Sequence, residues 1–182
     1  MNESSSDPSY TITAEIEVPQ GGADGMIINE GGRFGGYGMY LLKSKPVFVW
    51  NLLLLKRTRW EGPALSPGKH TLVFDFKYDG LGDVTLAYNA LSGVGRSGTG
   101  TLSVDGAVVA TQKMERTIPL LMPLDDAFTI GGASGPPLVD EDYHVPLPFT
   151  GKLNGVTITV APPILTEEDK RKLEAANRDG RD

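Results

Sequence analysis

Alternation of apolar and polar residues is the dominant pattern along this chain. In residues 10–18 the even positions are apolar, and the odd positions hold threonine or glutamate. The same period of two recurs in four later segments, at residues 72–78, 102–104, 108–110 and 156–160. A period of two predicts β-strands with one buried face and one face in water.

Other segments extend this prediction to an all-β fold. Residues 26–28 and 37–42 are short apolar runs, and residues 47–55 are apolar at both parities, as in a central strand covered on both sides. Asp105-Gly106 between two alternating segments predicts a tight hairpin, because both turn residues tolerate positive φ. Seven or more short strands favour an antiparallel β-sandwich.

One helix is predicted, near the C-terminus. Thr166 is a candidate N-cap, and the acidic residues 167–169 would lie in the first turn, where the helix dipole favours negative charge. The helix would continue through 170–177 and stop at Gly180. We therefore expect a disordered lead at residues 1–9, a sandwich at 10–160, and a tail with a surface helix at 161–182.

Composition narrows the function classes. The 182 residues include 17 Lys and Arg against 23 Asp and Glu, for a net charge of −6, which argues against nucleic acid as a partner. The absence of cysteine removes disulfides, thiolate metal sites and a thiol nucleophile. No secretory signal and no run of 18 apolar residues is visible, so we expect no membrane partner and, by default, a soluble cytoplasmic protein.

No pattern in the chain predicts a catalytic site. The two histidines, His70 and His144, are not near a Gly-x-Ser-x-Gly elbow, since the chain contains none, and we interpret both as surface or edge residues. The glycine-rich segment 31–36 is followed by a strand pattern rather than by the helix that a phosphate loop requires. We interpret it as a tight β-turn that presents Arg33 and Phe34, although Phe34 could also pack over the sandwich edge.

Two groups of side chains are candidates for ligand binding. Trp60 is the best candidate for an exposed sugar platform, whereas Trp50 lies in an apolar strand and is expected in the core. Arg57 and Arg59 precede Trp60 and could meet a sulfated or carboxylated ligand, or they could protect an edge strand from aggregation.

Acidic loop residues are the candidates for a metal site. They are Asp125, Asp126, Asp140, Glu141 and Asp142. Carboxylates on sandwich loops can hold Ca²⁺, but no EF-hand spacing is present, and the alternative is a solvated acidic loop. No other cofactor is expected.

An ordered set of motifs resembles the C-terminal domain of bacterial arylsulfatases. The motifs span residues 10–160 and include Ile12-Thr13-Ala14-Glu15-Ile16-Glu17-Val18-Pro19, Gly31-Gly32-Arg33-Phe34-Gly35-Gly36, Pro67-Gly68-Lys69-His70, Phe76-Lys77-Tyr78-Asp79-Gly80, Gly98-Thr99-Gly100-Thr101-Leu102 and Phe149-Thr150-Gly151-Lys152-Leu153. The resemblance implies a concanavalin-A-like or laminin-G-like sandwich. Residues 82–97 look like an added segment, and the tail after Pro163 lies outside the resemblance.

The resemblance implies an accessory role rather than catalysis. Sulfatases of this family use a formylglycine made from Cys or Ser in a Cys/Ser-x-Pro-x-Arg motif, and this chain has no such motif, so no catalytic residue carries over. The main expectation is a non-catalytic module that packs on a sulfatase catalytic domain, in cis or in trans. The alternative is a carbohydrate-binding module for sulfated or acidic glycans that uses Arg33, Phe34, Arg57, Arg59 and Trp60. Independent sulfatase activity is a third reading.

Overall fold

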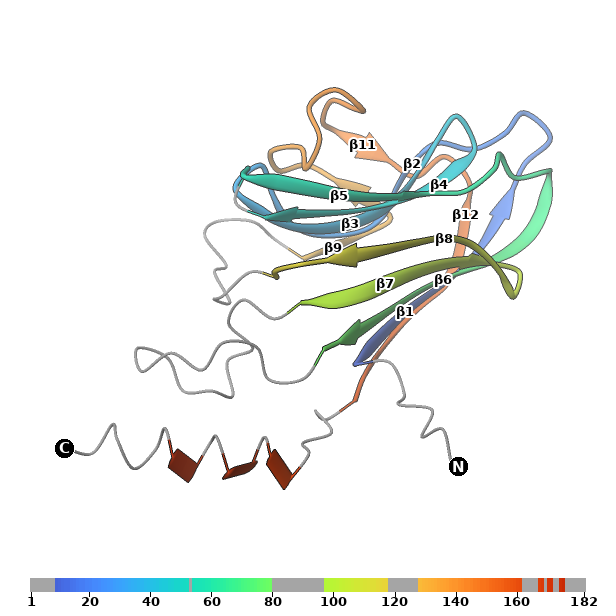
Figure 1. The fold of residues 1–182 in the computed structure, drawn as a ribbon. Coiled ribbons are helices and arrows are strands. Elements are labelled where there is room, and N and C mark those ends of the chain that lie inside the picture. Colours follow the sequence, from blue (N-terminus) through green and yellow to red (C-terminus); the bar gives the residue numbers. More distant parts are fainter. Residues whose placement is uncertain are drawn as a thin grey trace.

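Two five-stranded antiparallel sheets face each other in the computed structural model of this chain (Figure 1). It describes residues 9–52, 54–79, 97–117 and 128–161, together with 167–168, 170–171 and 174–175. The first sheet has the order β12-β1-β6-β7-β8, with strands at Lys152–Val160, Tyr10–Val18, Gly68–Tyr78, Gly98–Val104 and Ala107–Met114. The second has the order β5-β4-β3-β2-β9, with strands at Lys56–Glu61, Lys45–Leu52, Gly35–Leu42, Gly25–Gly32 and Thr129–Ile130. A small third pair joins β10 (Gly132–Ala133) to β11 (Leu147–Pro148).

The predicted antiparallel β-sandwich is thus confirmed. The segments expected to be strands fall in β1, β2, β3, β4, β6, β7, β8 and β12. The prediction of a covered strand over 47–55 is wrong at its end, because β4 stops at Leu52 and the chain turns there, which leaves Leu54 and Leu55 exposed. The Asp105-Gly106 hairpin joins β7 to β8, and both residues have positive φ, at 50° and 83°. In the C-terminal tail, residues 167–168, 170–171 and 174–175 are helical. Thr166, Asn177 and Gly180 lie outside the described residues, as do Gly82 to Arg96 of the added segment.

The main core fills the space between the two sheets. It holds the even-numbered residues of β1, as the alternation predicted, and an aromatic group from both sheets. Within that group, the Trp60 ring lies 5.7 Å from Phe48 and 4.9 Å from Phe74, centroid to centroid, in edge-on geometry. Edge-to-face packing of buried rings adds to the free energy gained from burying their area.

A second apolar cluster lies on the outer side of the second sheet. Residues 131–148 cross this face (Figure 1), and Leu138, Val139 and Tyr143 pack on residues of β2, β3 and β4. This cover explains why β4 is buried at both parities, as its mostly apolar sequence predicted. The crossing segment also brings the acidic residues 140–142 onto the sheet.

Candidate functional site

The turn between β2 and β3 presents Arg33 and Phe34 at one end of the second sheet. Gly31 and Gly36 make this turn, both with positive φ, and a Cβ on either would lie 2.1 Å from a backbone oxygen across the turn. No other residue type could approach so closely. The prediction of a tight β-turn is confirmed, and Phe34, which could have packed over the sandwich edge, is instead 63% exposed.

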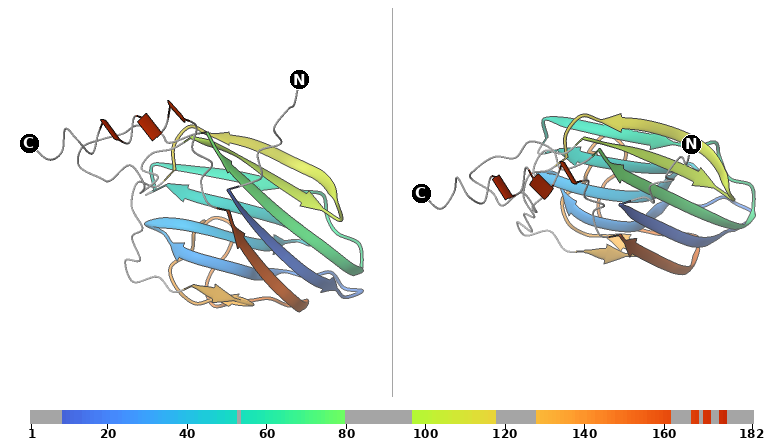
Figure 2. Two further views of the ribbon diagram at one scale, coloured as in Figure 1. Left: turned by 90° about the horizontal axis from the view of Figure 1, so that it is seen from below. Right: turned by 60° about the horizontal axis from the view of Figure 1, so that its bottom comes forward.

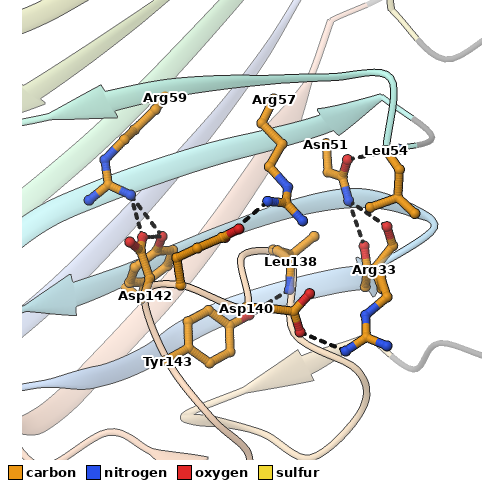
Figure 3. Close-up of polar contacts among 12 residues, drawn as sticks. Arg33, Asn51, Leu54, Arg57, Arg59, Leu138, Asp140, Asp142 and Tyr143 are labelled. Atoms are coloured by element: carbon orange, nitrogen blue, oxygen red, sulfur yellow. Dashed lines mark hydrogen bonds and ion pairs between the residues drawn. The ribbon is translucent and has the colours of Figure 1, made fainter.

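A buried asparagine fixes this turn. The Asn51 Nδ2 group donates hydrogen bonds to the carbonyls of Gly32 (3.0 Å) and Arg33 (2.8 Å), and its Oδ1 accepts one from the Leu54 amide (3.2 Å) (Figure 3). Asn51 therefore ties the β2–β3 turn to the β4–β5 turn. Sequence reasoning gave Asn51 no role; its signal was a lone amide inside an apolar strand.

The structure contradicts the prediction that Trp60 is an exposed sugar platform. Trp60 is fully buried in the main core, and its indole N–H donates to the Gly100 carbonyl at 2.8 Å. The reason is strand parity, because Trp60 pairs with the inward-facing Phe48, whereas Arg57 and Arg59 pair with Asn51 and Val49 and take the outer face. The predicted core position of Trp50 is confirmed.

Three ion pairs join the outer face to the crossing segment. Arg33 Nη2 lies 2.6 Å from Asp140 Oδ1, and Arg57 Nη1 lies 3.1 Å from Glu141 Oε2. Arg59 binds Asp142, which also accepts a hydrogen bond from the Tyr40 hydroxyl (Figure 3). The three arginines predicted to bind an anionic ligand therefore bind the acidic residues 140–142, which were candidates for calcium.

The three pairs differ in how firmly they are held. The Asp142 side chain is 15% exposed, and Arg59 also donates to Glu61 from Nε and Nη2. The Leu138 amide donates to the Tyr143 hydroxyl at 3.0 Å, which fixes the segment beside Asp142. Asp142 is therefore the anchored end of the acidic run, and Asp140 and Glu141 are more open to solvent.

The electrostatics follow these contacts. The hydrogen bond from Arg33, helped by the charges of Arg33 and Arg57, holds the pKa of Asp140 below its ordinary value. Burial, reinforced by the hydrogen bond to Asp142, raises the pKa of the Tyr40 hydroxyl well above its ordinary range. Hydrogen bonds from Arg59 and Lys45 lower the pKa of Glu61. Asp140 and Glu61 thus lie beside arginine cations that favour their ionised forms.

No metal centre is formed by the residues described. Across 9–52, 54–79, 97–117 and 128–161, no three His, Asp or Glu side chains gather in a geometry that could hold an ion. Asp140 and Asp142 are bound to arginines instead. Asp125 and Asp126 lie outside the described residues, so a calcium site that includes them stays a prediction.

His70 lies near a carboxylate, but away from the arginine face. Its Nδ1 is 2.7 Å from Asp105 Oδ2 and its Nε2 is 2.8 Å from the Ser66 carbonyl oxygen. Both ring nitrogens therefore face acceptors, and among the described residues neither nitrogen contacts a hydroxyl that it could activate. This contact joins the β7–β8 hairpin to the start of β6, so His70 is interpreted as a structural residue. His144 is exposed, as expected.

The part of the chain that the structure describes contains no helix with the length and apolarity needed to span a membrane.

Comparison with known proteins relates this chain to others through its fold. No protein-family model and no curated protein sequence matches it. Among solved structures, domains LG4-5 of the mouse laminin alpha1 chain are similar at a TM-score of 0.55 and 13% identity, over 92% of this chain and 41% of that one. The CBM40 module of the Ruminococcus gnavus IT-sialidase, bound to alpha2,6 sialyllactose, is similar at a TM-score of 0.50 and 13% identity, over 94% of this chain and 84% of that one. These similarities establish a laminin-G-like sandwich fold. They show no link to sulfatases.

Proposed function

We propose that this chain is a non-catalytic module that binds acidic glycans at the β2–β3 turn. One observation carries the proposal: an exposed aromatic residue, Phe34, and a half-exposed arginine, Arg33, are neighbours on a turn that Asn51 fixes. Arg57 extends the cationic surface along the outer face of β5. Trp60, which is buried, has no part in this site.

The chemistry of these side chains suits a sugar acid. The face of an aromatic ring can cover the apolar face of a sugar ring, and a guanidinium can bind a carboxylate or a sulfate through two parallel hydrogen bonds. Because Asn51 holds the turn backbone in place, ligand binding has to order only the exposed side chains and not the backbone. The complex of the similar CBM40 module with sialyllactose supports this ligand class, since sialyllactose carries a carboxylate.

Calorimetric titration of the full chain tests the proposal. The probes are a heparin-derived hexasaccharide and 6′-sialyllactose, with lactose as the neutral control. We expect binding of at least one acidic probe, no binding of lactose, and loss of binding in Phe34→Ala and Arg33→Gln.

Val108→Ala is the matched control variant. Val108 is 64% exposed, as much as Phe34, but lies at the β7–β8 hairpin of the other sheet. The control should bind like the wild type. Failure of both acidic probes to bind, or equal loss of affinity in Val108→Ala, would refute the proposal.

Docking to a sulfatase catalytic domain is the second candidate, and a separate surface favours it. Phe128, Ile130, Ile158 and Val160 are all exposed apolar residues. They belong to or adjoin β9 and β12, which follow the same open side of the sandwich (Figure 2). Exposed apolar residues gathered along one side are typical of a protein interface.

Size-exclusion chromatography with an arylsulfatase catalytic domain that lacks its own C-terminal domain tests this candidate. A one-to-one complex that is lost in Ile158→Ser and kept in Val108→Ser would support it; co-elution that both variants retain, or no complex, would refute it. The purified chain alone should release no sulfate from an aryl sulfate.

A further inference from the structure

Arg33 and Arg57 use only a small part of their hydrogen-bonding capacity. A guanidinium has five N–H donors arranged in a planar fork. Among the described residues, the Arg33 side chain binds Asp140 through Nη2 alone, and the Arg57 side chain binds Glu141 through Nη1 alone (Figure 3). The Arg57 Nε is buried and has no hydrogen-bond partner among the described residues. Arg59, in contrast, uses Nε, Nη1 and Nη2.

The carboxylates on these two arginines are the exposed ones. The Glu141 side chain is 74% exposed and that of Asp140 is 41% exposed. Ion pairs in such surroundings contribute little to stability, because water and salt screen them and because two side chains must be ordered. An anion that accepts more hydrogen bonds could therefore replace Asp140 and Glu141 with little loss of folding stability. The contacts of Asp142, Leu138 and Tyr143 would keep the segment attached to the sheet.

We infer that Asp140 and Glu141 are internal counter-ions that cap a two-arginine anion site formed by Arg33 and Arg57, and that a glycan with two anionic groups displaces them. The inference rests on the proposed function and names its ligand class. Two neighbouring carboxylates of one segment reach both arginines, so the matching ligand carries two sulfates or carboxylates on one sugar or on adjacent sugars. A ligand with one anionic group would displace one cap only.

The net charge of the chain restricts how this site can bind an anion. With a net charge of −6, the chain repels polyanions over long range. Binding must then come from short-range bidentate contacts, which Arg33 and Arg57 can make once their single carboxylate caps are displaced.

Neutralising the caps tests the inference. The double variant Asp140→Asn/Glu141→Gln is titrated with the heparin-derived hexasaccharide at 150 mM NaCl, with the wild type in parallel. The matched control is Glu15→Gln/Glu17→Gln, which also removes two negative charges, but from β1 on the other sheet. We expect the cap variant to bind at least threefold more tightly than the wild type, and the control to change affinity by less than half as much on a logarithmic scale.

Two further measurements make the result specific. Adding Arg33→Gln or Arg57→Gln to the cap variant should abolish the gain, and thermal unfolding of each variant shows that the sandwich is intact. 6′-Sialyllactose, which carries one carboxylate, should gain less from cap removal than the hexasaccharide does.

The outcomes separate the inference from the proposed function. Unchanged affinity of the cap variant, alongside wild-type binding that requires Phe34, would overturn the inference and leave the function standing. Equal tightening in the cap variant and the Glu15/Glu17 control would overturn it as a net-charge effect. Absence of binding in the wild type and all variants would refute both.

Discussion

Replacing Trp60 by phenylalanine distinguishes a core residue from a sugar platform. The substitution removes the indole N–H that binds the Gly100 carbonyl and leaves a void beside Phe48 and Phe74. Loss of a buried hydrogen bond costs about 1 kcal/mol. A void of roughly 40 Å³, at about 24 cal/mol per Å³, adds about 1 kcal/mol. The expected loss in the free energy of unfolding is therefore about 2 kcal/mol.

Urea denaturation followed by far-ultraviolet circular dichroism measures this loss without relying on tryptophan fluorescence. For a chain of this length, about 2 kcal/mol corresponds to a fall of about 4–8 °C in Tm. Phe34→Ala is the matched comparison, and because Phe34 is exposed its unfolding free energy should change by less than about 0.5 kcal/mol.

Glycan binding should respond in the opposite way. Trp60→Phe should bind the acidic glycan as the wild type does, and Phe34→Ala should not. A Trp60→Phe variant of wild-type stability that loses binding would refute the reasoning, because it would return the indole to the surface.

Three further predictions concern stability. Gly100→Ala should lose about 1–3 kcal/mol through overpacking, because its Cβ would lie 2.5 Å from the Trp60 ring, whereas Gly21→Ala, with nothing within 4 Å, should be neutral in the same urea assay. Asp142→Asn should lose about 1–3 kcal/mol, because Tyr40 and Arg59 lose a charged acceptor; a variant as stable as the wild type in thermal unfolding would contradict the anchoring role. Burial lowers the pKa of His70, but the Asp105 and Ser66 contacts outweigh burial and raise the pKa overall. The stabilisation of the fold by protonated His70 is therefore complete below the ordinary pKa of histidine and is lost as pH rises through the pKa in the folded protein. The stability difference between wild type and His70→Gln should therefore shrink between pH 5.5 and 8.5, with the His70 titration followed by NMR; a difference that grew would reverse the assigned sign.

The sequence alone determined most of the strands and the sandwich, but not β5 or the two-residue strands β9, β10 and β11. Alternation decides which side of a strand can be buried, and in β1 it did so residue by residue. The Asp105-Gly106 hairpin was also predictable, because the turn depends on the two residues that form it. In β5, parity puts Trp60 on the inner face once the strand is paired with the apolar β4.

Only the tertiary structure decided what the charged residues do. Arg33 meets Asp140 across 107 positions, and Arg57 meets Glu141 across 84, and no spacing rule links residues so far apart. These pairs exist because residues 131–148 turn back over the outer face of the second sheet and bury Leu138 and Tyr143 there. Local sequence fixes which backbone shapes and faces are available, whereas the partners of a charge depend on how distant segments pack.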